Sequence, residues 1–359
     1  MAQKIRILLL GSAFAADLHV DAYSRIREHI EIVGVASSDE AQTYSLMSRY
    51  NFSGYQYFND FKKAVVECDC DVVDICLPNF LHHPAAMSAI EHDRHVICEK
   101  PLATTVQAGR EMVKAAKDAG KRIYYAEDWM GSPALSKARA IIAEGAIGEL
   151  KFIRAREAHS GSHSPFVQKV ATAGGGAMIH LGPHPVTFAL AINQNRWTEL
   201  VAMTSGGGAN NLMHHNLEGE DWAAALMKFE DGSKAILEAN FVTYGGMEDS
   251  IDFYGTKGCL HVDLTFSSPI HGYSIPGFEY TVEKAEITTG WSRPVVDEKY
   301  NLGYVAELAI FVDCLEKGID APVGLRGEDG LETLEVIDLI YQSSKTGNKM
   351  INPKQGQWK

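Results

Sequence analysis

Short apolar runs alternate with amphipathic stretches through the first 125 residues. The runs have the length of strands, and the stretches between them have the periodicity of helices that pack one face on a sheet. Strands and helices that alternate over short linkers are typical of a parallel sheet covered on both faces. We therefore predict an α/β, doubly wound Rossmann domain over residues 1–125, with strands at residues 5–10, 32–36, 72–77, 95–98 and 122–126.

The pattern changes after a predicted helix over residues 133–143. Longer alternating runs follow, which indicate strands with one buried face, as in an antiparallel sheet, at residues 151–157, 223–229, 235–241 and 250–254. Turn sequences at residues 230–232 and 256–258 indicate hairpins, and residues 264–300 are predicted to be irregular. Helical periodicity returns at residues 304–317 and 327–346. We predict a second, α+β domain over residues 126–359, with a large open, mostly antiparallel sheet.

Composition narrows the possible partners. The chain has 33 Lys and Arg against 46 Asp and Glu, a net charge of -13 that disfavours nucleic acids and anionic lipid surfaces. No apolar run approaches the ~18 residues of a membrane span, and the N-terminus lacks the features of a signal peptide. The six cysteines contain no CxxC pair. We therefore expect a cytoplasmic protein whose cysteines are reduced.

The sequence CEKPLA at residues 98–103 resembles a motif of the glucose-fructose oxidoreductase, inositol dehydrogenase and rhizopine-catabolism (Gfo/Idh/MocA) superfamily. Further matching segments follow in family order at residues 77–82, 137–149, 173–177, 255–258 and 327–331. The resemblance implies an NAD(P)-dependent oxidoreductase that oxidises a hydroxyl of a sugar, a sugar derivative or a cyclitol. It also implies that the second domain binds the substrate and that its open sheet face forms a homodimer or homotetramer.

The cofactor loop departs from the family pattern GxGxxG or GxGxxA. Residues 11–16 read GSAFAA, so that Gly11 is the only glycine of the pattern that remains. Alanine is the smallest substitute for glycine, and the Ser12 hydroxyl can donate to a phosphate. The resemblance implies that NAD is held by Gly11, Ser12, Ala13, Phe14, Ala15, Ser37, Ser38, Pro78, Asn79, His82, Glu99 and Lys100.

The end of the second predicted strand bears on the choice between NAD and NADP. A carboxylate at this position commonly holds the ribose 2′-hydroxyl of NAD, whereas this chain has Ser37 and Ser38. Serine tolerates a 2′-phosphate, but no Arg follows to neutralise it, and Asp39 and Glu40 would oppose it. We therefore expect NAD and leave NADP open.

Lys100, His184 and His180 are the expected catalytic residues. The resemblance implies that Lys100 bonds the reacting hydroxyl, and that a histidine in a DxxxH segment takes its proton. Here that segment reads HLGPH, so that His184 is kept and His180 replaces the usual Asp. We expect His180 to bind a neighbouring hydroxyl. A second imidazole at this position also suggests a different ring position, a different acid–base task or an acidic substrate, and a buried structural histidine is the alternative.

Further side chains are expected to bind the substrate. Asp128 and Trp129 belong to a segment where many family members carry Asn and Arg. Strand alternation puts Arg154 and Arg156 on one face and Glu157 on the other. Imidazoles and hydroxyls suit a polyhydroxylated ligand, and cationic side chains can hold an anionic substituent. The predicted substrate-binding residues are Asp128, Trp129, Arg156, His159, His163 and Lys169.

Three other interpretations remain open. The HxxxH spacings at residues 159–163 and 180–184 are compatible with a metal site, although we expect no metal because the resemblance gives His184 another role. Some relatives oxidise a sugar transiently with tightly bound NAD and cleave a glycosidic bond, and the additional histidines are compatible with that reaction. The altered glycine loop is compatible with a regulatory protein, but Lys100 and His184 favour an enzyme.

Overall fold

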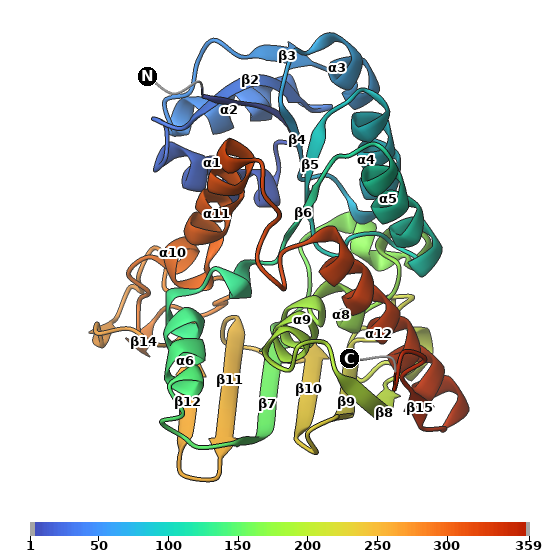
Figure 1. The fold of residues 1–359 in the computed structure, drawn as a ribbon. Coiled ribbons are helices and arrows are strands. Elements are labelled where there is room, and N and C mark those ends of the chain that lie inside the picture. The colour runs from blue at the N-terminus through green and yellow to red at the C-terminus, as the bar shows by residue number, and fades with distance from the viewer. Residues whose placement is uncertain (1–3, 357–359) are drawn as a thin grey trace. The chain divides into compact units, whose positions relative to one another are not determined.

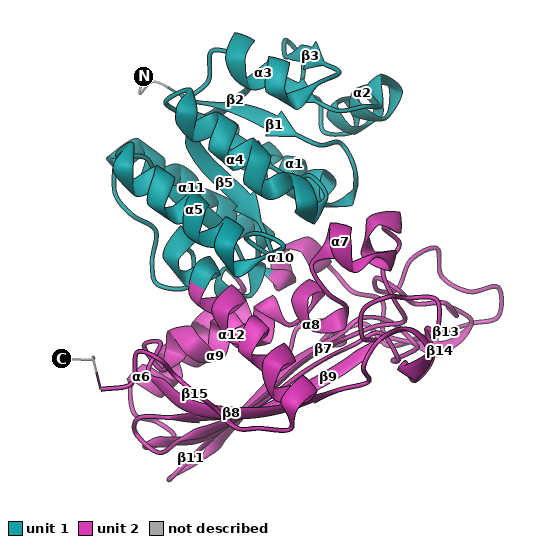
Figure 2. Ribbon diagram, turned by 90° about the vertical axis from the view of Figure 1, so that its right-hand side faces the viewer, with its two compact units in different colours: residues 1–131, 303–331 teal, residues 132–302, 332–359 magenta. Residues whose placement is uncertain are grey.

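A computed structural model describes residues 4–356. The chain divides into two compact units, of which unit 1 contains residues 1–131 and 303–331 and unit 2 contains residues 132–302 and 332–359 (Figure 2). The domain boundary predicted at residues 125/126 stays a prediction. The compact units show in addition that the chain returns to unit 1 late, after it has passed through unit 2.

The sheet of unit 1 is parallel throughout, in the order β3-β2-β1-β4-β5-β6 (Figure 1). This is the strand order of a dinucleotide-binding Rossmann fold, which confirms the predicted fold class. The order reverses between β1 and β4, where such sheets bind ligands at the carboxyl ends of their strands. The strands are β1 (Ile5–Leu10), β2 (Ile30–Ala36), β3 (Gln56–Phe58), β4 (Val72–Ile75), β5 (His95–Glu99) and β6 (Ile123–Ala126).

Helices cover both faces of this sheet (Figure 1). One group contains α1 (Phe14–Ser24), α2 (Glu40–Arg49) and α11 (Tyr304–Lys317), and the other contains α3 (Phe61–Glu67), α4 (His82–Glu91) and α5 (Val106–Asp118). Because both faces are covered, the strands are almost wholly apolar, and Ile7, Leu8, Leu9 and Leu10 of β1 are fully buried. The core of unit 1 therefore lies on both sides of the sheet.

Helix α11 completes unit 1 from a distant part of the sequence. It packs against α1 and against strands β1 and β6. Its buried residues Tyr304, Leu308 and Phe311 recur at helical spacing, and the Phe311 ring lies 5.4 Å from that of Tyr124. Burying side chains such as Leu308 and Phe311 stabilises the fold by about 1.5–3 kcal/mol each. The sequence predicted this helix but not its place in unit 1.

Unit 2 contains a seven-stranded sheet in the order β12-β11-β7-β10-β9-β8-β15. Only β7 and β10 run parallel among the neighbouring strands of this described sheet, and the other pairs are antiparallel. The predicted mostly antiparallel sheet is therefore confirmed. The strands are β7 (Leu150–Ala158), β8 (Trp197–Thr204), β9 (Trp222–Phe229), β10 (Lys234–Asn240), β11 (Glu248–Gly255), β12 (Cys259–Asp263) and β15 (Met350–Ile351).

One face of this sheet is covered by helices that include α8 (Ala177–His180) and α9 (Pro183–Ile192). The segment predicted to be irregular contains two short paired strands, β13 (Gly272–Ser274) and β14 (Gly290–Ser292). No helix between residues 4 and 356 is long and apolar enough to cross a membrane. The remaining helices are α6 (Pro133–Ala143), α7 (Val170–Ala173), α10 (Glu298–Leu302) and α12 (Gly327–Thr346).

Candidate functional site

The cofactor loop follows β1 at the point where the strand order reverses. Gly11 has a φ of +114°, and a Cβ at this position would lie 2.4 Å from the carbonyl oxygen of Cys76 after β4. Only glycine therefore allows the ends of β1 and β4 to approach so closely. The next helix, α1, begins at Phe14, and its N-cap Ala13 provides no side-chain cap. Its first N–H groups are the kind of donors that hold the pyrophosphate of a dinucleotide, so the loop fits NAD despite its missing glycines.

A neutral polar cluster lies beside this loop. The Ser12 hydroxyl is 2.7 Å from that of Ser37 and donates to Gln42 Oε1 at 3.1 Å. Asp39 caps α2 by accepting the Gln42 N–H at 2.8 Å. A cavity of about 300 Å³ adjoins the cluster and is lined by Ser12, Ala13, Phe14, Asp17, Gln42, Ser45, Leu46 and Arg49. Of the predicted cofactor residues, the structure thus brings Ser12 and Ser37 together and adds Gln42, which the sequence did not indicate.

The turn after β5 carries Lys100, which is joined to Pro101 by a cis peptide bond. The Lys100 N–H donates to Glu99 Oε2 at 3.0 Å. The buried His82 ring spans two turns, because Nδ1 lies 2.8 Å from the Pro101 carbonyl and Nε2 lies 2.8 Å from the Leu77 carbonyl. Both nearby predicted residues, Glu99 and His82, therefore support the backbone around Lys100.

Asp128 and Trp129 lie in a short 3-10 helix after β6. Because Glu99 at the end of β5 pairs with Ala126 of β6, the segments that follow these strands leave the sheet at the same edge. Asp128 is 4% exposed, and burial raises its pKa to about 7, against the opposing effect of the Lys100 charge. Titration near neutrality is typical of a carboxyl that takes part in proton transfer.

In unit 2, a histidine is paired with a carboxylate. His184 lies in the first turn of α9, and Glu157 lies near the end of β7. Their side chains are 3% and 5% exposed, and His184 Nε2 is 3.5 Å from Glu157 Oε2. A carboxylate near an imidazole orients the ring and stabilises its protonated form. Glu157 thus supplies a negative charge near His184. In the family pattern an Asp at position 180 would supply such a charge.

The segment that carries His180 and His184 is held by another buried carboxylate. Glu220 accepts the N–H of Gly176 at 3.1 Å and that of Met178 at 2.7 Å, both at the start of α8. The hydroxyl of Tyr341 also donates to it, at 3.0 Å. These bonds satisfy N–H groups that α8 itself leaves unpaired. Glu220 therefore fixes the short helix on which His180 lies.

Replacing Glu220 by Gln is expected to flatten the dependence of stability on pH. Burial raises the pKa of Glu220 to about 7, although the hydrogen bond from Met178 opposes this shift. Because this pKa is higher in the folded than in the unfolded state, the stabilising contribution is complete below about pH 4 and is lost as the pH rises to about 7. Ionisation of Glu220 should lower the free energy of unfolding of the wild-type protein by up to about 3 kcal/mol.

Urea unfolding at pH 5 and pH 8 measures the effect. Glu220→Gln should lose less stability between these pH values than the wild type, even if its missing acceptor lowers stability at both. The exposed Glu218 is a matched control, and Glu218→Gln should keep the wild-type dependence. If the free energy of unfolding fell equally in the wild type and in Glu220→Gln between pH 5 and pH 8, the prediction would be contradicted.

Three of the predicted histidines gather in unit 2. The His159 ring stacks on Phe241 at a centroid distance of 5.2 Å, and the His180 ring lies 5.8 Å from the same ring. Phe241 and His163 also line a cavity of about 490 Å³. Its other lining residues are mainly hydroxyl, amide and imidazole side chains, from Ser160, Ser162, Gln168, His214, His215 and Asn216, together with Gly161, Val167, Met213 and Leu217.

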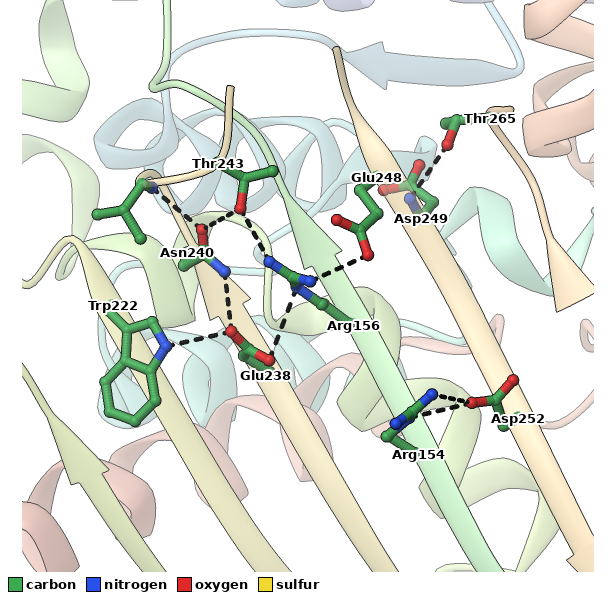
Figure 3. A network of polar contacts seen from close by, with 11 residues as sticks. Arg154, Arg156, Trp222, Glu238, Asn240, Thr243, Glu248, Asp249, Asp252 and Thr265 are labelled. Carbon is green, nitrogen blue, oxygen red and sulfur yellow. Dashed lines mark hydrogen bonds and ion pairs between the residues drawn. The ribbon is translucent and has the colours of Figure 1, made fainter. Parts of the chain in front are cut away.

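Arg156 lies apart from this group. Successive residues of β7 alternate between the two faces of the sheet, so Arg154 and Arg156 share the face opposite Glu157. Figure 3 shows the Arg156 guanidinium among the neighbouring strands, 3.0 Å from Glu248 Oε1 and 2.9 Å from Thr243 Oγ1. Lys169 is exposed at the start of α7. The roles predicted for Arg156 and Lys169 stay predictions.

Both parts of the chain match models of known protein families. The family model described as "Oxidoreductase family, NAD-binding Rossmann fold" matches residues 5–127, and the GFO/IDH/MocA C-terminal domain model matches residues 135–261. D-glucoside 3-dehydrogenase of Escherichia coli is 24% identical over 96% of this chain and 97% of its own length. Inositol 2-dehydrogenase of Rubrobacter xylanophilus is 23% identical over 96% of this chain and 92% of its own length.

A solved structure has the same fold over nearly the whole chain. GenD2 from gentamicin A biosynthesis, solved in complex with NAD, superimposes with a TM-score of 0.88 at 23% identity, over 98% of this chain and 97% of that one. The two family models together match more than half of the chain. The chain therefore belongs to the Gfo/Idh/MocA family and is an NAD(P)-dependent oxidoreductase with an NAD-binding Rossmann domain.

Proposed function

We propose that the protein oxidises a secondary hydroxyl of a sugar, a sugar derivative or a cyclitol, with Lys100 and His184 as its acid/base groups. The observation that carries the proposal is the buried pair of His184 and Glu157, 3.5 Å apart. NAD, when bound, accepts the hydride from the substrate carbon. His184 takes the hydroxyl proton, and Glu157 stabilises the resulting imidazolium. Lys100 stabilises the negative charge that develops on the substrate oxygen.

The cavity of unit 2 supports a polyhydroxylated substrate. Its volume of about 490 Å³ is within the range of small-molecule sites, and its lining offers many hydrogen-bonding groups. In this proposal His159, His163 and His180 bind hydroxyls beside the reacting one. Asp128 and Trp129 also bind the substrate, and Lys169 is assigned to an anionic substituent. Arg156 is not given this role, because it lies on the face of the sheet opposite Glu157 and its guanidinium bonds Glu248 and Thr243. The relatives named for glucosides and inositol act on ligands of this chemistry.

A panel of candidate substrates tests the proposal. Purified protein is mixed with NAD and with D-glucose, methyl glucosides, myo-inositol or glucuronic acid, and NADH is followed by its absorbance. We expect NADH to appear with at least one neutral polyol or glycoside. The absence of turnover across sugars, sugar acids, glycosides and cyclitols would contradict the proposed substrate class.

NAD-dependent cleavage of a glycoside is a second candidate. The specific observation is the number of imidazoles around the cavity, where His163, His214 and His215 offer more acid/base groups than a simple oxidation needs. The same panel with p-nitrophenyl glycosides separates the two reactions. Release of nitrophenol without net NADH favours cleavage, whereas stoichiometric NADH favours oxidation.

NAD is expected to bind at least about tenfold more tightly than NADP. Residues 37–48 contain no Lys or Arg, and the Ser12, Ser37 and Gln42 cluster is neutral. Arg49, which lines the adjoining cavity, is paired with Asp17 at 2.6 Å. Asp39, which follows closely, would repel a 2′-phosphate. Calorimetric titration of the cofactor-free protein with each dinucleotide measures the ratio of the two dissociation constants. Ser37→Arg should narrow this ratio. Equal affinities of the wild type for the two dinucleotides, or a preference for NADP, would contradict the prediction.

The face of the unit 2 sheet that carries Arg154 and Arg156 supports assembly into a homodimer or homotetramer. Val201, Met203 and Leu226 are 41%, 67% and 54% exposed. Val201 pairs with Leu226, and Met203 pairs with Ala224, whose other partner is Glu238 of the network in Figure 3. Exposed apolar side chains beside ordered polar groups are typical of protein interfaces. Light scattering after size-exclusion chromatography should give at least a dimer, and a monomer at micromolar concentration would contradict this assignment.

A further inference from the structure

A buried series of polar side chains within unit 1 extends from helix α1 to the Lys100 turn. His19 and Tyr23 lie one turn apart on α1, Asp74 lies on β4, and Glu99 ends β5. The side chains of His19 and Asp74 are fully buried, and that of Glu99 is 9% exposed. Charged groups are rarely buried so completely unless they are paired.

Each member of the series bonds the next. Tyr23 donates its hydroxyl to Asp74 Oδ2 at 2.8 Å, and His19 Nδ1 lies 2.9 Å from the same oxygen. His19 Nε2 lies 3.2 Å from Glu99 Oε1, while Glu99 Oε2 accepts the Lys100 N–H at 3.0 Å. Both oxygens of Glu99 are therefore engaged, one by His19 and one by the backbone of Lys100.

The charges along this series alternate in sign. Both ring nitrogens of His19 face carboxylates, so both carry a hydrogen and the ring is an imidazolium. Burial acts to lower the pKa of His19, but Asp74 outweighs it and holds the pKa well above its usual value. The order is then Asp74 negative, His19 positive, Glu99 negative and Lys100 positive. Such alternation offsets much of the cost of burying each charge.

We propose that His19 is a positioning residue that holds Lys100 in place through Glu99. The inference rests on the proposed function, in which Lys100 contacts the reacting hydroxyl. Without the bond from His19, the Glu99 carboxylate is free to rotate away from the Lys100 N–H. A displacement of about 1 Å in a catalytic group can lower the rate by about 10²-fold. The bond to Asp74 already ties α1 to the sheet, whereas the bond to Glu99 reaches the Lys100 turn.

Two substitutions of His19 separate these two bonds. His19→Gln places an amide N–H close to the position of Nε2 and keeps a donor for Glu99. His19→Asn places its amide close to the position of Nδ1 and keeps a donor for Asp74 only. Two measurements are made on the full-length protein with NAD: hydrogen exchange of the Lys100 amide, and kcat and KM on the hydroxyl substrate found in the panel.

We expect His19→Asn to speed exchange of the Lys100 amide by about tenfold or more, because that N–H loses its fixed acceptor. Its kcat should fall by about 10- to 100-fold, with KM within about threefold of the wild type. His19→Gln should keep exchange and kcat within about threefold of the wild type. Tyr23→Phe removes only the hydroxyl that donates to Asp74. It should lower thermal stability without changing the exchange of the Lys100 amide or kcat.

Unchanged Lys100 exchange in His19→Asn would overturn the proposal. It would also be overturned if all three variants lost kcat in proportion to their loss of thermal stability, because that result indicates a structural role alone. If no substrate is found, the proposed function fails, but amide exchange still decides whether His19 positions Lys100. Should His19→Asn not fold, adding Asp74→Asn removes the excess buried charge, and the combined variant should show the same faster exchange.

Discussion

Lys100→Met is expected to lower kcat by about 10³-fold or more while NAD binding stays within about threefold of the wild type. Methionine retains much of the length of lysine but cannot donate to the substrate oxygen or stabilise its negative charge. The backbone N–H of residue 100 can still bond Glu99, so the turn should persist. Steady-state kinetics on the substrate from the panel and calorimetric titration with NAD give the two numbers.

A matched control separates this effect from a general change of charge. Lys62 is exposed on α3 of the same unit, and Lys62→Met should leave kcat unchanged. If Lys100→Met turned over substrate at the wild-type rate, Lys100 would have no catalytic role, although the family assignment would still hold. A loss confined to NAD binding would instead indicate that Lys100 holds the cofactor.

His184→Asn is expected to reduce kcat by about 10³-fold, because no base then takes the hydroxyl proton. Glu157→Gln should reduce kcat by about 10- to 100-fold, since an amide in place of the carboxylate stabilises the imidazolium less well. The combined variant should be no slower than His184→Asn alone, because Glu157 acts through the ring it contacts. These rates are measured with saturating NAD over pH 6–10.

The same sheet provides a control for this pair. His261 on β12 is 62% exposed in its side chain, and its Nδ1 lies 2.7 Å from Asp252 Oδ1. His261→Asn breaks a comparable histidine–carboxylate pair and should leave kcat unchanged. If the losses from His184→Asn and Glu157→Gln multiplied fully in the combined variant, the two residues would act independently, contrary to the prediction.

Features encoded by neighbouring residues could be predicted from the sequence. The apolar runs of unit 1 predicted its parallel sheet, and the alternation of residues 151–157 was sufficient to separate Glu157 from Arg156. Motifs in family order identified the family, which the family models confirm. Local pattern is sufficient here because strand periodicity and turn chemistry act over a few residues.

Features that depend on distant residues could not be predicted in this way. Asp74 lies 55 residues from its partner His19, and Glu99 lies 80 residues from it. Glu220 is 44 residues from the N–H of Gly176 that it accepts. A single sequence shows Asp74 as an isolated polar residue in an apolar stretch and Glu220 among other acidic residues. In each case only the fold reveals the partner. Gln42 beside Ser12 was missed for the same reason.

The late return of the chain to unit 1 has a consequence during protein synthesis. The first segment of this unit ends at residue 131, and its last segment begins at residue 303, which is 303 − 131 = 172 residues later. At translation rates of about 5–20 residues per second, this interval lasts roughly 10–30 s. For that time the apolar surface that α11 later covers on α1 faces the surroundings of the ribosome. The nascent chain therefore presents a transient binding surface for chaperones. Unit 2 is completed later still, because its last segment, residues 332–359, follows the last segment of unit 1.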